Sequence, residues 1–234
     1  MRWSKGPTNA RYWMVSVLLV FVALGCKAES VGVEVPRGGP DAISMEDLQR
    51  DVFLVEDNRK GREAGVARSA RAWRGLEDRL RQMHLVPAYG RGFVGEESPM
   101  VLCGRKDGTG GGVVLVAAED DPAQPGASSA GLATLVSLAK AWDVPLPPER
   151  TLLFCAWSGT AGHDAFVAHP PVKIEDIEGG IVMTVPGREA FATLPVSTQP
   201  IDTDEKPERV DFRAIRDHAV RLDGLVRGLV NGAH

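Results

Sequence analysis

Continuous apolar runs mark the strands of this chain. Val113–Ala117, Thr151–Trp157 and Gly180–Val185 are apolar almost throughout and lack the alternation of a half-exposed strand. Runs of this kind, bounded by glycine or turn residues, are typical of strands covered on both faces, as in a parallel sheet. Met100–Gly104 predicts a further strand, and Leu194–Val196 predicts a short one.

Between these runs, apolar residues recur at steps of three and four, which predicts amphipathic helices. The first helix should begin near Ser44, a capping hydroxyl followed three residues later by Asp47. The other helices are marked by three sets of apolar positions: Val66, Ala70, Trp73, Leu76, Leu80 and Met83; Leu132, Leu135, Val136, Ala139 and Trp142; and Phe212, Ile215, Ala219, Leu222, Val226 and Leu229. This alternation predicts a three-layer α/β fold, with helices on both faces of a mainly parallel or mixed sheet.

The first residues have the pattern of an export signal rather than of a folded domain. A basic start precedes the apolar run Met14–Leu24, which is too short to span a bilayer, and Ala-Leu-Gly then leads into Cys26. This ending resembles the bacterial lipobox, in which the cysteine is acylated and becomes the new N-terminus. The alternative is an N-terminal anchor helix that ends in an incidental cysteine. We therefore predict a signal peptide over residues 1–25, a flexible tether over 26–42 and one domain over 43–234.

Charge excludes one class of partner. Removing the predicted signal peptide leaves 24 basic and 31 acidic residues, a net charge of −7. This charge argues against nucleic acid as a partner. Cys103 and Cys155 lie in apolar runs, where buried free thiols are ordinary, although an exported protein could pair them in a disulfide.

Acidic residues follow the first buried run directly. Glu119, Asp120 and Asp121 stand where α/β sheets place catalytic groups, just past the carboxyl end of a strand. His163 and Asp164 follow the next buried run, so the two loops should lie side by side. Together the five residues could attract Ca²⁺ or Mg²⁺. The alternative is that Asp121 caps a turn and that His163 and Asp164 begin a short helix.

Other polar residues have structural interpretations. Ser128 and Ser129 are interpreted as N-caps of the helix that runs through Leu132. His169 precedes two prolines and is interpreted as a surface loop residue.

The order of motifs resembles the M28 family of zinc peptidases, over about Ile43–Asn231. The matching segments are Gly61-Arg62 with the helix that follows, Leu85–Pro87, Val113–Asp120, Pro125–Ala127 with Ser129–Gly131, Arg150–Gly159, Met183–Arg188, and Asp202-Thr203 with Lys206. The resemblance implies the sheet of a zinc exopeptidase. The family's long segment before its last histidine is reduced here to Arg188–Thr198, so we expect fewer strands and a shortened edge.

The resemblance also implies a site of two zinc ions, held by two histidines and three carboxylates, with a glutamate as general base. Metal ions bound in this way lower the pKa of a water molecule, and the glutamate takes its proton. Of the corresponding positions, Asp120 alone keeps an acid, and in the family that acid orients a histidine that is absent here. The vestigial site positions are Ala118, Asp120, Ser128, Ser129, Thr160, Ala161, Thr184 and Gln199.

These departures lead to two competing predictions, beside a third interpretation in which the chain is a remnant with no function of its own. The first is a lipid-anchored pseudopeptidase of the bacterial cell envelope, with no catalytic residue and no cofactor, that serves in binding or scaffolding. Its partners would be the membrane, through the lipid on Cys26, and an unidentified protein or peptide. Lys27, in place of an aspartate, favours the outer membrane. The second prediction is an active zinc aminopeptidase with non-standard ligands.

Overall fold

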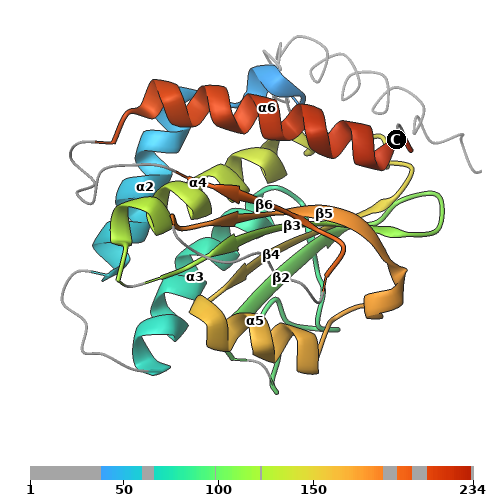
Figure 1. The fold of residues 1–234 in the computed structure, drawn as a ribbon, viewed down its shortest axis with the longest axis horizontal. Helices are drawn as coiled ribbons and strands as arrows, with labels where there is room; N and C mark the ends of the chain where they lie inside the picture. The colour runs from blue at the N-terminus through green and yellow to red at the C-terminus, as the bar shows by residue number, and fades with distance from the viewer. Residues whose placement is uncertain are drawn as a thin grey trace, which may run out of the picture. The chain divides into compact units, whose positions relative to one another are not determined.

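The computed structural model describes residues 38–59, 66–97, 99–121, 123–186, 194–201 and 210–232. In it, six strands form one mixed sheet in the order β1-β2-β4-β3-β5-β6 (Figure 1). The strands are β1 (Val86–Pro87), β2 (Val101–Lys106), β3 (Val113–Glu119), β4 (Thr151–Trp157), β5 (Ile177–Thr184) and β6 (Ser197–Pro200). β3 is parallel to both of its neighbours, β4 and β5, and β5 is parallel to β6. β2 is antiparallel to both β1 and β4.

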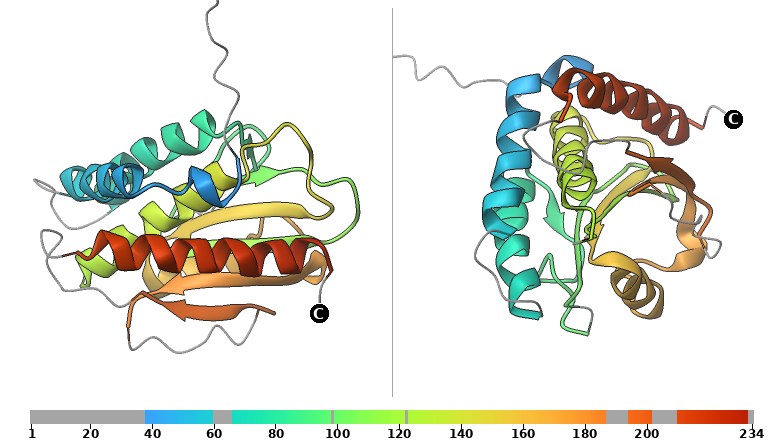
Figure 2. Two further views of the ribbon diagram at one scale, coloured as in Figure 1. Left: turned by 90° about the horizontal axis from the view of Figure 1, so that it is seen from above. Right: turned by 60° about the vertical axis from the view of Figure 1, so that its left-hand side comes forward.

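Helices cover both faces of the sheet. They are η1 (Pro40–Ala42), α2 (Met45–Arg59), α3 (Val66–Gln82), α4 (Pro125–Ala141), α5 (Gly159–Ala168), η2 (Ile174–Asp176) and α6 (Phe212–Val230). α4 and α6 pack on one face, with α2 outside α4, whereas α5 packs on the other face (Figure 2). The predicted three-layer α/β fold is therefore confirmed.

Burial explains why the apolar runs predicted strands so well. Every residue of β3 is buried, as is every residue of β4 except Thr151. Alternate residues of β3 enter the two cores: Val114, Val116 and Ala118 face α4, whereas Val113, Leu115 and Ala117 face α5. A strand with an apolar core on each face has no solvent-facing positions, so its sequence shows no alternation.

Helix starts follow local hydrogen bonds. The first long helix begins at Met45, and the backbone N–H of Asp47 donates to Ser44 Oγ over 3.1 Å, as the capping pattern predicted. The interpretation of Ser128 and Ser129 as N-caps was wrong. α4 begins earlier, at Pro125, because a proline at the first helical position has its φ angle already fixed for the helix.

Two further expectations need correction. Leu194–Val196 is not a strand; the edge strand begins at Ser197, and Leu194 is buried against the α5 face. His163 and Asp164 lie within α5 rather than at its start, because the helix begins at Gly159. The edge strand β6 has four residues, a short edge as predicted.

A disulfide joins Cys103 and Cys155, for which the sequence allowed either free thiols or a bond. Cys103 on β2 and Cys155 on β4 face each other in the antiparallel register, with their Cα atoms 4.2 Å apart. Both side chains are fully buried in the core on the α5 face. The bond therefore ties the antiparallel strand β2 to the parallel part of the sheet.

Candidate functional site

The carboxyl ends of β3 and β4 are where this topology favours a functional site. α4 follows β3 on one face of the sheet, whereas α5 follows β4 on the other face. In open α/β sheets, ligands bind in the crevice between two adjacent strands whose following connections run to opposite faces. Here the two loops are hydrogen-bonded to each other. Asp120 N donates to Trp157 O over 2.8 Å, and Gly159 N donates to Asp120 O over 3.0 Å. The two loops therefore lie side by side, as the sequence predicted.

Ala118 is closed into the main core at the end of the central strand. Its side chain has no exposed surface and faces α4 at Gly131. A Cβ atom at Gly131 would lie 3.9 Å from the Cβ atoms of both Ala118 and Met183, so the backbone of α4 packs closely on the sheet here. This position, where the resemblance implies a histidine, is therefore filled by core packing.

The two serines of α4 are engaged in structural hydrogen bonds. Ser128 Oγ accepts from Asp121 N over 2.7 Å and donates to Asp121 O over 2.9 Å, which closes the loop between β3 and α4. Ser129 Oγ donates to the Glu56 carboxylate, and both side chains are buried. Glu56 comes from α2, and the sequence offered no signal for this contact because 73 residues separate the two partners.

The remaining vestigial positions differ in burial and environment. Thr160 and Ala161 lie in the first turn of α5 and are exposed. Thr184 ends β5 and is buried, and its carbonyl accepts from Ile201 N. None of these three side chains is one that holds zinc in proteins.

Gln199 lies on β6 beside α6. Its amide donates to Ser197 Oγ over 2.8 Å, and it lines a cavity of about 530 Å³ together with His218 and Arg221. Burial, and then the charge of Arg221, lower the pKa of His218.

The acidic and histidine side chains at the strand ends are largely buried. Glu119 is 1% exposed and Asp120 is 8% exposed, whereas the side chain of Asp164 is 74% exposed. His163 is buried edge-on against Trp157, with ring centroids 5.8 Å apart. Over the part of the chain that the structure describes, no three His, Cys, Asp or Glu residues are grouped so that they could hold a metal ion.

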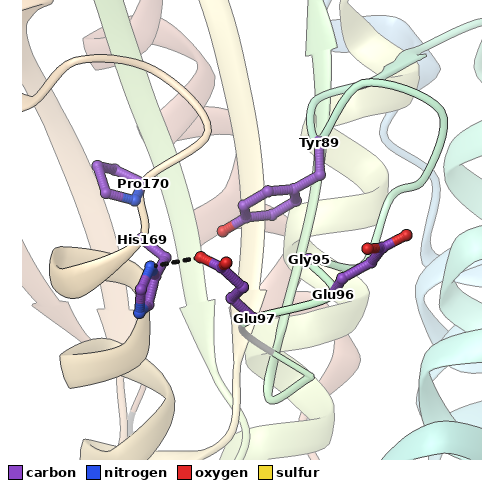
Figure 3. A pocket seen from close by; sticks show the side chains of 6 residues that line it. All are labelled: Tyr89, Gly95, Glu96, Glu97, His169 and Pro170. Carbon is purple, nitrogen blue, oxygen red and sulfur yellow. Dashed lines mark ion pairs between the residues drawn. The ribbon is translucent and has the colours of Figure 1, made fainter.

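A further pocket is lined by residues for which the sequence predicted no contact with one another. His169, at the end of α5, pairs with Glu97 of the segment before β2, at 2.9 Å between Nδ1 and Oε2 (Figure 3). No local pattern could have predicted a pair separated by so much of the chain.

Several predicted features lie outside the described residues. These are the signal peptide, Cys26, most of the tether, Gly61-Arg62, and Asp202-Thr203 with Lys206. Among the helices that the structure does describe, none is long and apolar enough to cross a membrane.

The packing around Ala118 leads to a test. Ala118→His is expected to lower the free energy of unfolding by about 2 kcal/mol, because an imidazole overpacks the contact between β3 and α4. Ala161→His is the matched control, since it adds the same ring at an exposed position and should change stability by less than about 0.5 kcal/mol. Urea denaturation measures both. Equal stability of the two variants would show that the strand end has room for a ligand.

Comparisons with known proteins identify the fold. No family model and no curated protein matches the sequence. Among solved structures, a Porphyromonas gingivalis glutaminyl cyclase matches with a TM-score of 0.60 and 9% identity, over 81% of this chain and 100% of that one. An Acidobacteriales bacterium glutaminyl cyclase matches with a TM-score of 0.58 and 10% identity, over 82% and 96%.

A zinc-dependent exopeptidase is also among the similar structures. The protein from Bacteroides vulgatus, described as putative, matches with a TM-score of 0.52 and 10% identity, over 79% of this chain and 96% of that one. Identities this low show the fold alone. The chain therefore has the fold that glutaminyl cyclases and zinc exopeptidases share.

Proposed function

We propose that this protein is a lipid-anchored, peptidase-like protein of the bacterial cell envelope that binds a protein or peptide partner and does not hydrolyse peptide bonds. One observation supports the proposed absence of hydrolysis most directly: Ala118, at the end of the central strand, is fully buried in the core and packs against Gly131. Zinc catalysis needs imidazole or carboxylate ligands around an open coordination position. An alanine in a packed core offers neither.

The neighbouring positions support the same proposal. Ser128 and Ser129 use their hydroxyls to hold the loop after β3 and the contact with Glu56. Thr160 and Ala161 present a hydroxyl and a methyl group where a zinc peptidase has two glutamates. Without a carboxylate at these positions, a water molecule would have no general base there.

The disulfide supports export. Cytosolic thiols are kept reduced, whereas exported bacterial proteins can form structural disulfides. The pairing of Cys103 with Cys155 thus agrees with the lipobox-like ending at Cys26. Acyl chains on Cys26 would hold the domain at the membrane, and Lys27 favours the outer membrane.

The test is zinc quantification joined to activity assays on purified, tag-free protein. We expect less than about 0.1 zinc per chain, an order-of-magnitude bound for a chain that lacks the family's ligands. We also expect no hydrolysis of chromogenic amino-acid amides and no cyclisation of a peptide with N-terminal glutamine. The second assay covers the activity named for the glutaminyl cyclases of the same fold.

The alternative is a zinc aminopeptidase that uses Glu119 or Asp120 as non-standard ligands. Both carboxylates are buried at the carboxyl end of β3, where this topology favours a functional site. Stoichiometric zinc that is lost together with activity in Glu119→Gln or Asp120→Asn would overturn our proposal. Glu149→Gln, on the connection to β4, is the control for loss of one negative charge.

The anchor is tested separately, by metabolic labelling with a fatty-acid analogue. Labelling should be lost in Cys26→Ala and kept in Lys27→Ala, because only the cysteine thiol is acylated. Label that is retained in Cys26→Ala would count against lipidation at this residue.

A further inference from the structure

The connection between α4 and β4 exposes an apolar tip, residues 144–148. The tip has the sequence Val-Pro-Leu-Pro-Pro and carries no charge. Leu146 is 78% exposed, more than any other large hydrophobic residue in the described part of the chain. Pro145 and Pro147 on either side of it are also exposed, whereas Pro148 is buried. The tip therefore presents a leucine between two prolines to the solvent.

The tip is held in place at both ends. At its start, Lys106 Nζ donates to the carbonyl of Val144 over 2.6 Å. At its end, Thr109 N donates to the carbonyl of Pro148 over 2.9 Å. Both donors belong to the chain that leads from β2 to β3, and the prolines of the tip fix their own φ angles. The tip therefore has little conformational entropy to lose when another surface covers it.

The first residues that the structure describes lie beside this tip. Gly39 N donates to Ala141 O, at the end of α4, over 2.6 Å. A Cβ atom at Gly38 would lie 1.8 Å from Cγ1 of Val144, so the backbone of Gly38 packs directly on the start of the tip. Gly38 lies 12 positions after Cys26, and a fully extended chain of that length spans about 40 Å at most. A lipid on Cys26 would therefore keep the tip near the surface of the bilayer.

The location of Leu146, more than its exposure, points to a lipid surface as the ligand. Single exposed leucines are common on proteins and need no explanation. This leucine is held rigidly, and it lies beside the residues that follow the predicted anchor. Burial of a leucine side chain favours the buried state roughly 10- to 100-fold. A short tether adds an effective concentration on the order of 1 mM, so a contact that is weak by itself would persist.

Charged groups around the tip indicate that the attraction is apolar rather than electrostatic. Asp143 and Glu149 flank the tip in the sequence, and both are acidic. His84 Nδ1 lies 3.0 Å from Asp143 Oδ1, and Lys106 donates to the carbonyl of Val144. An anionic headgroup would therefore gain little from this surface. Insertion of the tip needs the hydrophobic effect alone, so a neutral phospholipid suffices.

We propose that the tip inserts Leu146 into the headgroup and upper acyl region of the bilayer to which Cys26 is anchored. The inference rests on the proposed lipid anchor, and it adds a second membrane contact that fixes how the domain is turned. β4 begins beside the tip and runs to the strand ends of the vestigial site, a span of about 20 Å for its seven residues. Those strand ends would therefore face away from the membrane, where a partner can reach them.

The test measures how deeply a fluorescent label enters the bilayer. The complete acylated protein is reconstituted into phosphatidylcholine vesicles. Glu149→Cys, next to the tip, carries a nitrobenzoxadiazole label. Ala161→Cys carries the same label at an exposed position in the first turn of α5, beyond the other end of β4. Phosphatidylcholine with a nitroxide high on its acyl chain quenches a label that lies in the upper bilayer.

We expect the label at residue 149 to be quenched at least about threefold more than the label at residue 161, because interfacial segments sink about 5–10 Å into the headgroup and acyl boundary. Leu146→Ser, added to Glu149→Cys, should lower the quenching to the level at residue 161. Leu225→Ser is the matched control. It removes a leucine that is 50% exposed on α6, and it should leave the quenching at residue 149 unchanged. Circular dichroism checks that each variant is folded.

The wild-type chain, treated with the same thiol reagent, tests the anchor separately. Cys103 and Cys155 are bonded to each other, so an acylated Cys26 leaves no thiol to label. Label on the wild-type chain would mean that the anchor is absent, and both the anchor and the insertion of the tip would then be rejected.

The remaining outcomes decide the insertion alone, in protein whose wild-type chain takes up no label. Strong quenching at residue 149 that Leu146→Ser abolishes supports the proposal. Equal quenching at residues 149 and 161 overturns it, as does quenching that Leu146→Ser leaves unchanged. A blue-shifted but unquenched label at residue 149 would mean that protein covers the tip, which also overturns it.

Discussion

The double variant Cys103→Ala/Cys155→Ala will lose about 4 kcal/mol of unfolding free energy. The disulfide joins residues 52 positions apart, and closing a loop of that length removes much of the conformational entropy of the unfolded chain. Both sulfurs are buried in the core on the α5 face, so their removal also leaves small voids. The measurement is urea denaturation of the wild-type protein and the double variant under non-reducing conditions, with unfolding monitored by circular dichroism.

Two controls isolate the bond itself. Cys26→Ala removes a cysteine that takes no part in the disulfide and should leave the unfolding free energy unchanged. Wild-type protein unfolded in the presence of a strong reductant should approach the stability of the double variant. If the double variant loses less than about 1 kcal/mol, below the usual range for a native disulfide, the two sulfurs are not bonded in the folded protein.

Gly180→Ala will destabilise the protein by about 3 kcal/mol, the upper end of the usual cost of overpacking. A Cβ atom at this position would lie 2.2 Å from the backbone oxygen of Leu115 and 2.9 Å from its Cβ atom. The obstacle is backbone of the central strand, so it cannot be relieved by a change of rotamer. Relief requires β3 and β5 to separate, which weakens their hydrogen-bonded pairing.

Gly111→Ala is the matched control for this prediction. Gly111 lies in the exposed turn before β3, and a Cβ atom there would meet nothing within 4 Å. We expect a change of less than about 0.5 kcal/mol. Thermal and urea unfolding of the two variants would give the comparison. A Gly180→Ala variant as stable as Gly111→Ala would show that β3 and β5 are not packed at this spacing.

The strands and helices could be predicted because their signals are local. The apolar runs of β3 and β4 report burial on both faces, and steps of three and four report the buried stripe of α6. The edge strand was harder to place. β6 is short and partly exposed, so its residues carry no strong apolar pattern, and Leu194 just before it is buried without being part of a strand.

The details of the candidate sites depend on contacts between distant segments. The resemblance led us to predict that a ligand is missing at Ala118. It gave no sign that Gly131 lets α4 pack directly over this residue. Likewise, His169 looked like an isolated loop residue, whereas the end of α5 brings it to Glu97. Periodicity reports which side of an element is buried, but not which remote side chain it meets.

The middle position of β3 has a consequence for how the chain reaches this structure. Both neighbours of β3 come later in the sequence, and its second edge stays unpaired until β5 has been made. A strongly apolar strand with an unpaired edge is prone to aggregate, and the pairing of parallel strands that are distant in the sequence is slow. We therefore expect newly made chains to depend on a holding chaperone until the segment through Thr184 has emerged, and fragments that stop before it to be insoluble.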